Sequence, residues 1–104
     1  MPVTTIAGRE VTVDDEGFLT DPSQWDDDLG AALAAAIGID LTPEHWKVLH
    51  FLREDFAAQG ETATTRRVQT VGGFPTKDQF ALFPKKPAKK MAYIAGLPKP
   101  RGCV

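Results

Sequence analysis

Cys103 is the side chain best suited to covalent chemistry in this sequence, because it is the only cysteine and stands one residue from the end. It follows the run Gly96-Leu97-Pro98-Lys99-Pro100-Arg101-Gly102. Pro98 and Pro100 favour extended backbone, and Gly102 frees the residue just before the thiol. Because chain ends are poorly ordered unless something docks them, the run predicts a semi-rigid arm that carries a thiol on a flexible tip. A thiol presented in this way is placed to reach into the active site of another protein.

The surroundings of this thiol are basic. After Asp78 the chain has no acidic side chain, whereas six basic ones follow: Lys85, Lys86, Lys89, Lys90, Lys99 and Arg101. Positive charge favours the thiolate, which is the form of cysteine that attacks and carries sulfur. The alternative is an incidental terminal cysteine beside a solvated basic face, since an exposed lone thiol needs a chemical reason to be functional.

Composition limits the remaining classes of function. At 104 residues with one cysteine, the chain predicts one domain without a disulfide framework, as expected of a cytoplasmic protein. The most apolar stretch, residues 29–39, is too short to cross a membrane, and no signal peptide is apparent. His45 and His50 are five residues apart, which is poor spacing for two ligands on one helix face, so no metal site is expected.

Charge is divided unevenly along the chain. Residues 1–60 contain twelve acidic and three basic side chains, whereas residues 61–104 contain two acidic and nine basic ones. This division indicates an acidic body with a basic docking edge, contact with nucleic acid, or a solvated surface without a dedicated partner. Arg66 and Arg67 stand near a predicted helix start, where they suit either an anion such as a sulfur oxyanion or phosphate, or an ordinary surface role.

Periodicity and capping residues predict the strands and helices that position these residues. Residues 3–6 and 10–13 predict a hairpin, with residues 18–19 as a third short strand. Thr42 and Pro43 mark the start of a helix that Gly60 ends. Further helices are predicted over residues 25–37, from residue 64 or 65 to 71, and over 87–95, and residues 74–79 predict a turn into a short helix that ends before Pro84. Trp25 and Trp46 are predicted on apolar helix faces.

The predicted fold class is therefore α+β and mainly α. A β-meander (residues 1–20) packs on a helical array (residues 21–95), and a mobile arm (residues 96–104) carries Cys103.

Two longer motifs connect this pattern to a known family. The segments are Phe83-Pro84-Lys85-Lys86-Pro87-Ala88-Lys89-Lys90 and Ile94-Ala95-Gly96-Leu97-Pro98-Lys99-Pro100-Arg101-Gly102-Cys103-Val104, preceded by Gly17-Phe18-Leu19, Trp25 and Leu41-Thr42-Pro43-Glu44-His45-Trp46. In this order they closely resemble the DsrC/TusE family over nearly the whole chain, least between residues 60 and 79. The resemblance implies a small cytoplasmic protein with a mobile C-terminal arm.

The resemblance also implies a function. The penultimate cysteine, here Cys103, accepts sulfur as a persulfide from a DsrE/TusD-type donor and passes it to an acceptor protein, which on the TusE pattern is a tRNA-thiolating enzyme. Lys99 and Arg101 favour the anionic forms and docking, and Pro98, Pro100 and Gly102 shape the arm. The covalent persulfide is the only group expected, and the protein is expected to act as a carrier rather than as a turnover enzyme.

One position departs from the DsrC pattern. In DsrC proper a second cysteine lies eleven residues upstream of the penultimate one, and that position here is Ala92. The chain cannot form the intramolecular bridge, so it looks more like the TusE branch or a single-cysteine paralogue.

Two other functions stay open. The first is a partner of sulfite-reductase or sulfur-oxidation machinery, against which Ala92 argues. The second is a regulatory module that binds nucleic acid and senses redox state through its thiol. The acidic pI near 5.6 and the lack of evident base-reading residues make direct nucleic-acid binding unexpected.

Overall fold

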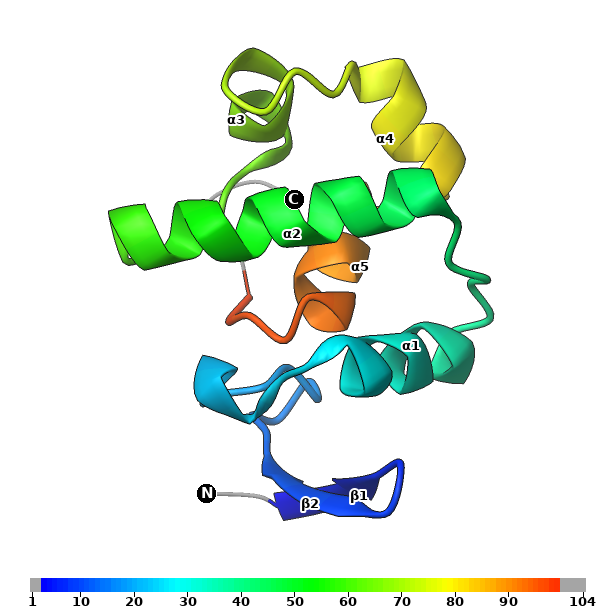
Figure 1. Ribbon diagram of the computed structural model, residues 1–104, viewed down its shortest axis with the longest axis vertical. Coiled ribbons are helices and arrows are strands. Elements are labelled where there is room, and N and C mark those ends of the chain that lie inside the picture. The colour runs from blue at the N-terminus through cyan, green and yellow to red at the C-terminus, as the bar shows by residue number, and fades with distance from the viewer. Residues whose placement is uncertain (1–2, 100–104) are drawn as a thin grey trace.

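The computed structural model describes residues 3–99. Two strands and a short 3-10 turn precede five α-helices: β1 (Val3–Ile6), β2 (Arg9–Thr12), the turn η1 (Pro22–Gln24), α1 (Asp27–Ala36), α2 (Pro43–Gln59), α3 (Thr65–Thr70), α4 (Thr76–Leu82) and α5 (Pro87–Ile94). The long helix α2 crosses the middle of the molecule, with α3 and α4 on one side and α1 and α5 on the other (Figure 1). The hairpin lies beyond α1, at the opposite end from α3 and α4.

The hairpin is antiparallel, with Val3 opposite Thr12 and Ile6 opposite Arg9. The predicted third strand is reduced to a single bridge between Val13 and Leu19. A sharp turn after β2 explains this, because the Asp14 carboxylate accepts the backbone N–H groups of Glu16 and Phe18 and leaves too few residues for a longer ladder. The mainly helical α+β fold with an N-terminal hairpin is confirmed.

Helix boundaries follow the capping residues. Thr42 accepts the N–H of His45 and Pro43 occupies the first turn of α2, while Gly60 ends that helix with φ 78°, as predicted. The predicted helix over residues 25–37 begins later, because Asp21 caps the η1 turn and Asp26 caps α1 by accepting the N–H of Leu29. Trp25 thus lies between two helical elements rather than inside one.

The apolar side chains form two clusters. The larger one gathers around α2 and α5, with Val48, Leu49, Leu52, Met91 and Ile94 all at 1% exposure or less. The smaller one joins the hairpin to α1: Val11, Val13, Leu19, Leu29 and Leu33. Tyr93 of α5 packs against both clusters, so α5 connects the hairpin end of the molecule to the helical array.

Candidate functional site

The described part of the predicted site is the root of the arm, which we define as residues 95–99. Pro98 and Lys99 belong to it, whereas Pro100, Arg101, Gly102 and Cys103 lie outside the described residues. Their predicted roles stay predictions.

The root begins with a Schellman motif at the C-terminal end of α5. The N–H of Leu97 donates to the carbonyl of Ala92 at 3.1 Å, and the N–H of Gly96 donates to the carbonyl of Tyr93 at 3.3 Å. Gly96 adopts φ 70°, the left-handed conformation that this motif requires. Leu97 is 1% exposed, so the chain turns back into the core before it leaves the body.

Trp25 fixes the direction of that turn. Its indole Nε1 donates to the carbonyl oxygen of Ile94 at 2.8 Å, which satisfies a carbonyl that the helix end leaves open. A Cβ atom at position 96 would lie 2.3 Å from Cδ1 of Trp25, closer than any real contact. Position 96 therefore requires glycine for two reasons: the positive φ angle and the closeness of the Trp25 indole.

Arg53 of α2 ties the root to the N-terminal half. Its Nη1 donates to the carbonyl of Ala95 at 2.7 Å and its Nη2 to the carbonyl of Pro22 at 2.8 Å. The guanidinium carbon lies 4.4 Å from the centroid of the Trp25 ring. Burial lowers the pKa of Arg53, but a guanidinium titrates so far above neutrality that it stays charged and keeps both donors.

Two further contacts hold the end of the root. The buried Thr62 hydroxyl donates to the carbonyl of Pro98 at 2.7 Å. Lys99 Nζ lies 2.8 Å from Oε2 of Glu16, in the turn that follows β2. Lys99 is thus directed at a carboxylate of the body, and its predicted support of the thiolate stays a prediction.

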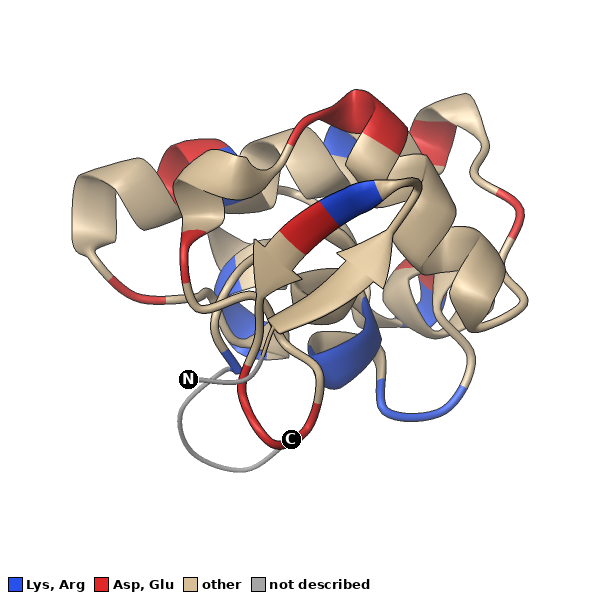
Figure 2. Ribbon diagram, turned by 90° about the horizontal axis from the view of Figure 1, so that it is seen from below, with Lys and Arg blue, Asp and Glu red and all other residues tan. Residues whose placement is uncertain are grey.

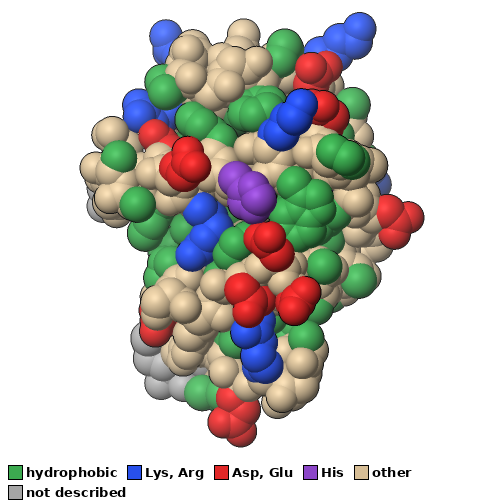
Figure 3. Space-filling view, in the orientation of Figure 1, with side chains coloured by type: hydrophobic (Ala, Val, Ile, Leu, Met, Phe, Trp, Pro, Cys, Tyr) green, Lys and Arg blue, Asp and Glu red, His purple; other side chains and the backbone are tan. Residues whose placement is uncertain are grey.

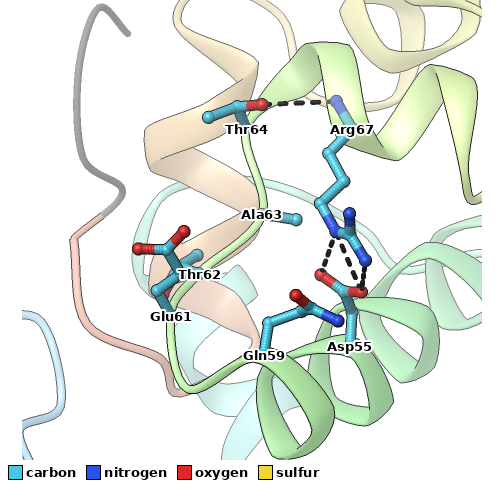
Figure 4. Close-up of a pocket in the computed structure, with 7 residues that line it drawn as sticks. All are labelled: Asp55, Gln59, Glu61, Thr62, Ala63, Thr64 and Arg67. Carbon is cyan, nitrogen blue, oxygen red and sulfur yellow. Dashed lines mark hydrogen bonds and ion pairs between the residues drawn. The ribbon is translucent and has the colours of Figure 1, made fainter.

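A small cavity lies next to the root, between the C-terminal half of α2 and the segment that leads to α3 (Figure 4). Its volume is about 130 Å³, and it is lined by Asp55, Gln59, Glu61, Thr62, Ala63, Thr64 and Arg67. A shallower hollow shares Glu61 and Thr62 with it and is completed by Pro98 and Lys99 of the root. The root therefore lines the hollow beside the cavity.

Arg67 points into the cavity and binds Asp55. Its Nε and Nη2 donate to the two carboxylate oxygens at 2.7–3.0 Å, and the hydrogen bonds to Asp55 raise the pKa of Arg67. Arg66, the residue before it, is exposed. The predicted pair therefore divides into an arginine that binds Asp55 and one that faces solvent, and the predicted anion contact stays a prediction.

The two histidines lie in different surroundings on α2. His45 is 6% exposed, and its ring nitrogens lie 3.0 Å from the N–H nitrogen of Thr42 and 2.8 Å from the Leu82 carbonyl. His50 is exposed beside Asp27 and Trp46; Figure 3 shows the surface histidine among hydrophobic and charged side chains. Within residues 3–99 no cluster of His, Cys, Asp or Glu is fit to hold a metal ion.

Ala92 of α5 is fully buried. The position at which the resemblance implies a second cysteine in DsrC proper is thus part of the core beneath the Schellman motif. Among the described residues no helix is long and apolar enough to cross a membrane.

Sequence reasoning interpreted Trp25 only as core and did not identify Arg53 or Thr62. All three bind main-chain carbonyls of residues that lie 31 to 69 positions away. Contacts with backbone atoms leave no partner side chain in the sequence, so no spacing could have indicated them.

Comparisons with known proteins agree with this architecture. The family model described as DsrC like protein matches residues 5–104. Sulfurtransferase TusE of Escherichia coli K12 is 39% identical over 105 residues, covering 93% of this chain and 95% of the relative. Sulfurtransferase TusE of Salmonella typhimurium LT2 is 36% identical over 104 residues, with the same coverage of 93% and 95%.

Solved structures show the same fold. DsrC of Allochromatium vinosum superposes with a TM-score of 0.80 at 33% identity, covering 98% of this chain and 97% of the other. The oxidized gamma subunit of the dissimilatory sulfite reductase (DsrC) of Archaeoglobus fulgidus superposes with a TM-score of 0.78 at 36% identity, covering 99% and 100%. By sequence and by structure, this chain belongs to the DsrC-like family.

Proposed function

We propose that this protein is a sulfur carrier, which accepts a persulfide on Cys103 from a DsrE/TusD-type donor and passes the outer sulfur to an acceptor protein. The observation that carries the proposal is the fixed root from which the chain's only cysteine departs. A tRNA-thiolating enzyme is the acceptor that the resemblance to the TusE branch favours. The relatives that bear the name Sulfurtransferase TusE support assignment to that branch.

The chemistry needs no oxidant or cofactor. The Cys103 thiolate attacks the outer sulfur of the donor's persulfide, the donor's S–S bond breaks, and the donor leaves as a thiolate while Cys103 becomes the persulfide. The acceptor's thiolate then attacks the outer sulfur of Cys103 and releases Cys103 as a thiolate. Each step exchanges one S–S bond for another, so rates depend on ionisation and on access to the sulfur.

A fixed root suits this exchange because it limits where the thiol can be. Cys103 follows Lys99 by four residues, so chain length alone keeps their Cα atoms within about 14 Å of each other. A donor or acceptor that docks on the body therefore finds the thiol within a small volume, which raises its effective concentration. Pro98, Pro100, Gly102 and Arg101 take part in this proposal as elements of the arm.

The sulfite-reductase alternative is less well supported. Three solved relatives carry the name of dissimilatory sulfite reductase or its gamma subunit, and the resemblance implies that such a role uses a second cysteine. This chain has Ala92 at that position, fully buried. A cycle that closes a disulfide between position 92 and Cys103 is not open to it.

The test is intact-mass analysis after incubation of the reduced protein with a persulfide-loaded DsrE/TusD-type donor, with Cys103→Ser as the control. The expected result is the addition of one sulfur atom to the wild-type protein, removable by a thiol reductant, and none to the variant. A wild-type protein that stays unmodified by a donor of proven loading would contradict the proposal.

A further inference from the structure

A second charged feature lies at the other end of α5. Lys85 and Lys86 are exposed in the loop before the helix, and Lys89 and Lys90 follow on its first turns. We call these four residues the lysine patch; Figure 2 shows them in blue along α5 and the loop that leads into it. Lys90 donates to the carbonyl of Pro84, and within residues 3–99 no carboxylate forms an ion pair with any of the four.

The backbone presents two of these lysines at a conformational cost. Lys85 has φ 58° and Lys86 has φ 40°, so two consecutive residues with a Cβ atom occupy the left-handed region. The segment is held on both sides, because Phe83 is fully buried and Ala88 is 3% exposed. Glycine or asparagine would adopt these angles more easily, so local structure does not account for lysine here.

The exposed side of α5 connects the lysine patch to the root. Lys86, Lys89, Lys90 and Tyr93 are spaced as neighbours on one helix face, and none of the four is buried. An eight-residue helix is about 12 Å long, so a single partner surface can cover both ends. Near the far end of this face, Lys99 is paired with Glu16.

From this arrangement we propose that the lysine patch docks an acidic face of the protein that exchanges sulfur with Cys103. The inference rests on the proposed function and adds the chemistry of the partner. That partner would carry carboxylates about one short helix length from its own sulfur-exchanging cysteine. Unpaired lysines at an interface rim accelerate encounter with an oppositely charged surface more than they strengthen the final complex.

An acidic protein fits better than nucleic acid. The turn that supplies Glu16 also contains Asp14 and Asp15, so the root lies beside carboxylates that a phosphate backbone would meet. The patch contains no arginine, which is the side chain that binds phosphate in a bidentate way. A protein surface can place its charges to match the lysines and to avoid the acidic turn.

The test uses the double variant Lys85→Asn/Lys86→Asn, because asparagine tolerates positive φ and the variant should fold at least as well as the wild type. The matched control is Lys47→Gln/Lys77→Gln, which removes two exposed lysines from other helices. For all three proteins we would measure the rate of sulfur transfer from a persulfide-loaded DsrE/TusD-type donor at about 50 mM and about 300 mM NaCl. Loading of Cys103 by glutathione persulfide, which needs no docking, is measured alongside.

The expected result is a rate from the donor protein that falls roughly 5-fold or more at low salt in the double variant and loses most of its salt dependence. The control should keep its rate, and all three should react equally with glutathione persulfide. An unchanged rate from the donor protein would overturn the docking proposal and leave the carrier function intact. Binding of tRNA, measured for the same proteins by gel shift, distinguishes the nucleic-acid alternative: an unchanged transfer rate with tRNA binding lost in the double variant would overturn the proposal and assign the patch to nucleic acid.

A wild-type protein that reacts with glutathione persulfide but takes no sulfur from the donor protein would overturn the proposed donor and this docking partner together. That outcome is distinct from the previous two, because it appears before any lysine is replaced.

Discussion

The two ends of α5 are built in opposite ways. At its C-terminal end, a Schellman motif and the side chains of Trp25, Arg53 and Thr62 bind the main-chain carbonyls of residues 92–95 and 98. At its N-terminal end, Lys86 is the cap residue and makes no side-chain capping bond. One end is fixed by the rest of the molecule, and the other presents charge to solvent. A single short helix can thus fix the segment that leads to Cys103 at one end and carry an exposed lysine cluster at the other.

The largest expected effect comes from Gly96→Ala, which changes the C-terminal end of α5. The added methyl group would collide with Trp25 and impose a strained φ, so we expect the free energy of unfolding to fall by about 3 kcal/mol. Gly38→Ala is the control, since Gly38 has φ 76° but nothing within 4 Å of the added atom. It should lose only about 1 kcal/mol in urea unfolding. Equal losses would show that the indole does not confine position 96.

The next effect is that of Arg53→Lys. One ammonium cannot span the carbonyls of Ala95 and Pro22 as the guanidinium fork does, so we expect a loss of about 2 kcal/mol in the free energy of unfolding. Arg9→Lys, at an exposed pair with Asp26, is the matched control and should cost clearly less. If both variants unfold at the same urea concentration, Arg53 does not hold the root.

Thr62→Val tests the last hydrogen bond of the fixed end. Valine keeps the shape of threonine but leaves the Pro98 carbonyl without its donor, which should cost about 1 kcal/mol. Hydrogen exchange at the Leu97 amide, which donates to the Ala92 carbonyl in the root, should rise at the same time. Thr76→Val removes a more exposed hydroxyl bond to Gln69 and should leave exchange at Leu97 unchanged. Unchanged exchange at Leu97 in Thr62→Val would contradict the role of this contact.

The smallest effect, of opposite sign, is expected at the other end of the helix. Lys85→Asn/Lys86→Asn replaces two strained lysines by a residue that tolerates positive φ. The free energy of unfolding should stay the same or rise by up to about 1 kcal/mol. A clear loss of stability would mean that the lysine side chains support the fold, and the contrast between the two ends would weaken.

Sequence reasoning succeeded where the signal is local. Thr42, Pro43 and Gly60 mark the ends of α2 because capping depends on residues within one helical turn. The start of α1 was misplaced because both Asp21 and Asp26 can cap a helix, and only the fold decides that the first caps a 3-10 turn. The fixed root was not predictable, since Arg53 and Thr62 bind backbone atoms distant in sequence.

The resemblance to a known family identified what periodicity alone could not. It identified the family from the tail motifs, and the comparisons confirm that identification. The role of Cys103 remains a proposal, because that residue lies outside the described part of the chain.

We propose that Cys103 relays sulfur and does not merely store or sense it. The most direct measurement loads Cys103 with isotopically labelled sulfur from the donor, removes the donor, and follows the label by mass spectrometry after addition of a tRNA-thiolating enzyme. The account predicts that the label moves to a cysteine of that acceptor and that Cys103 returns to a free thiol. A persulfide that stays on Cys103 until a chemical reductant removes it would contradict relay and favour a sensing role.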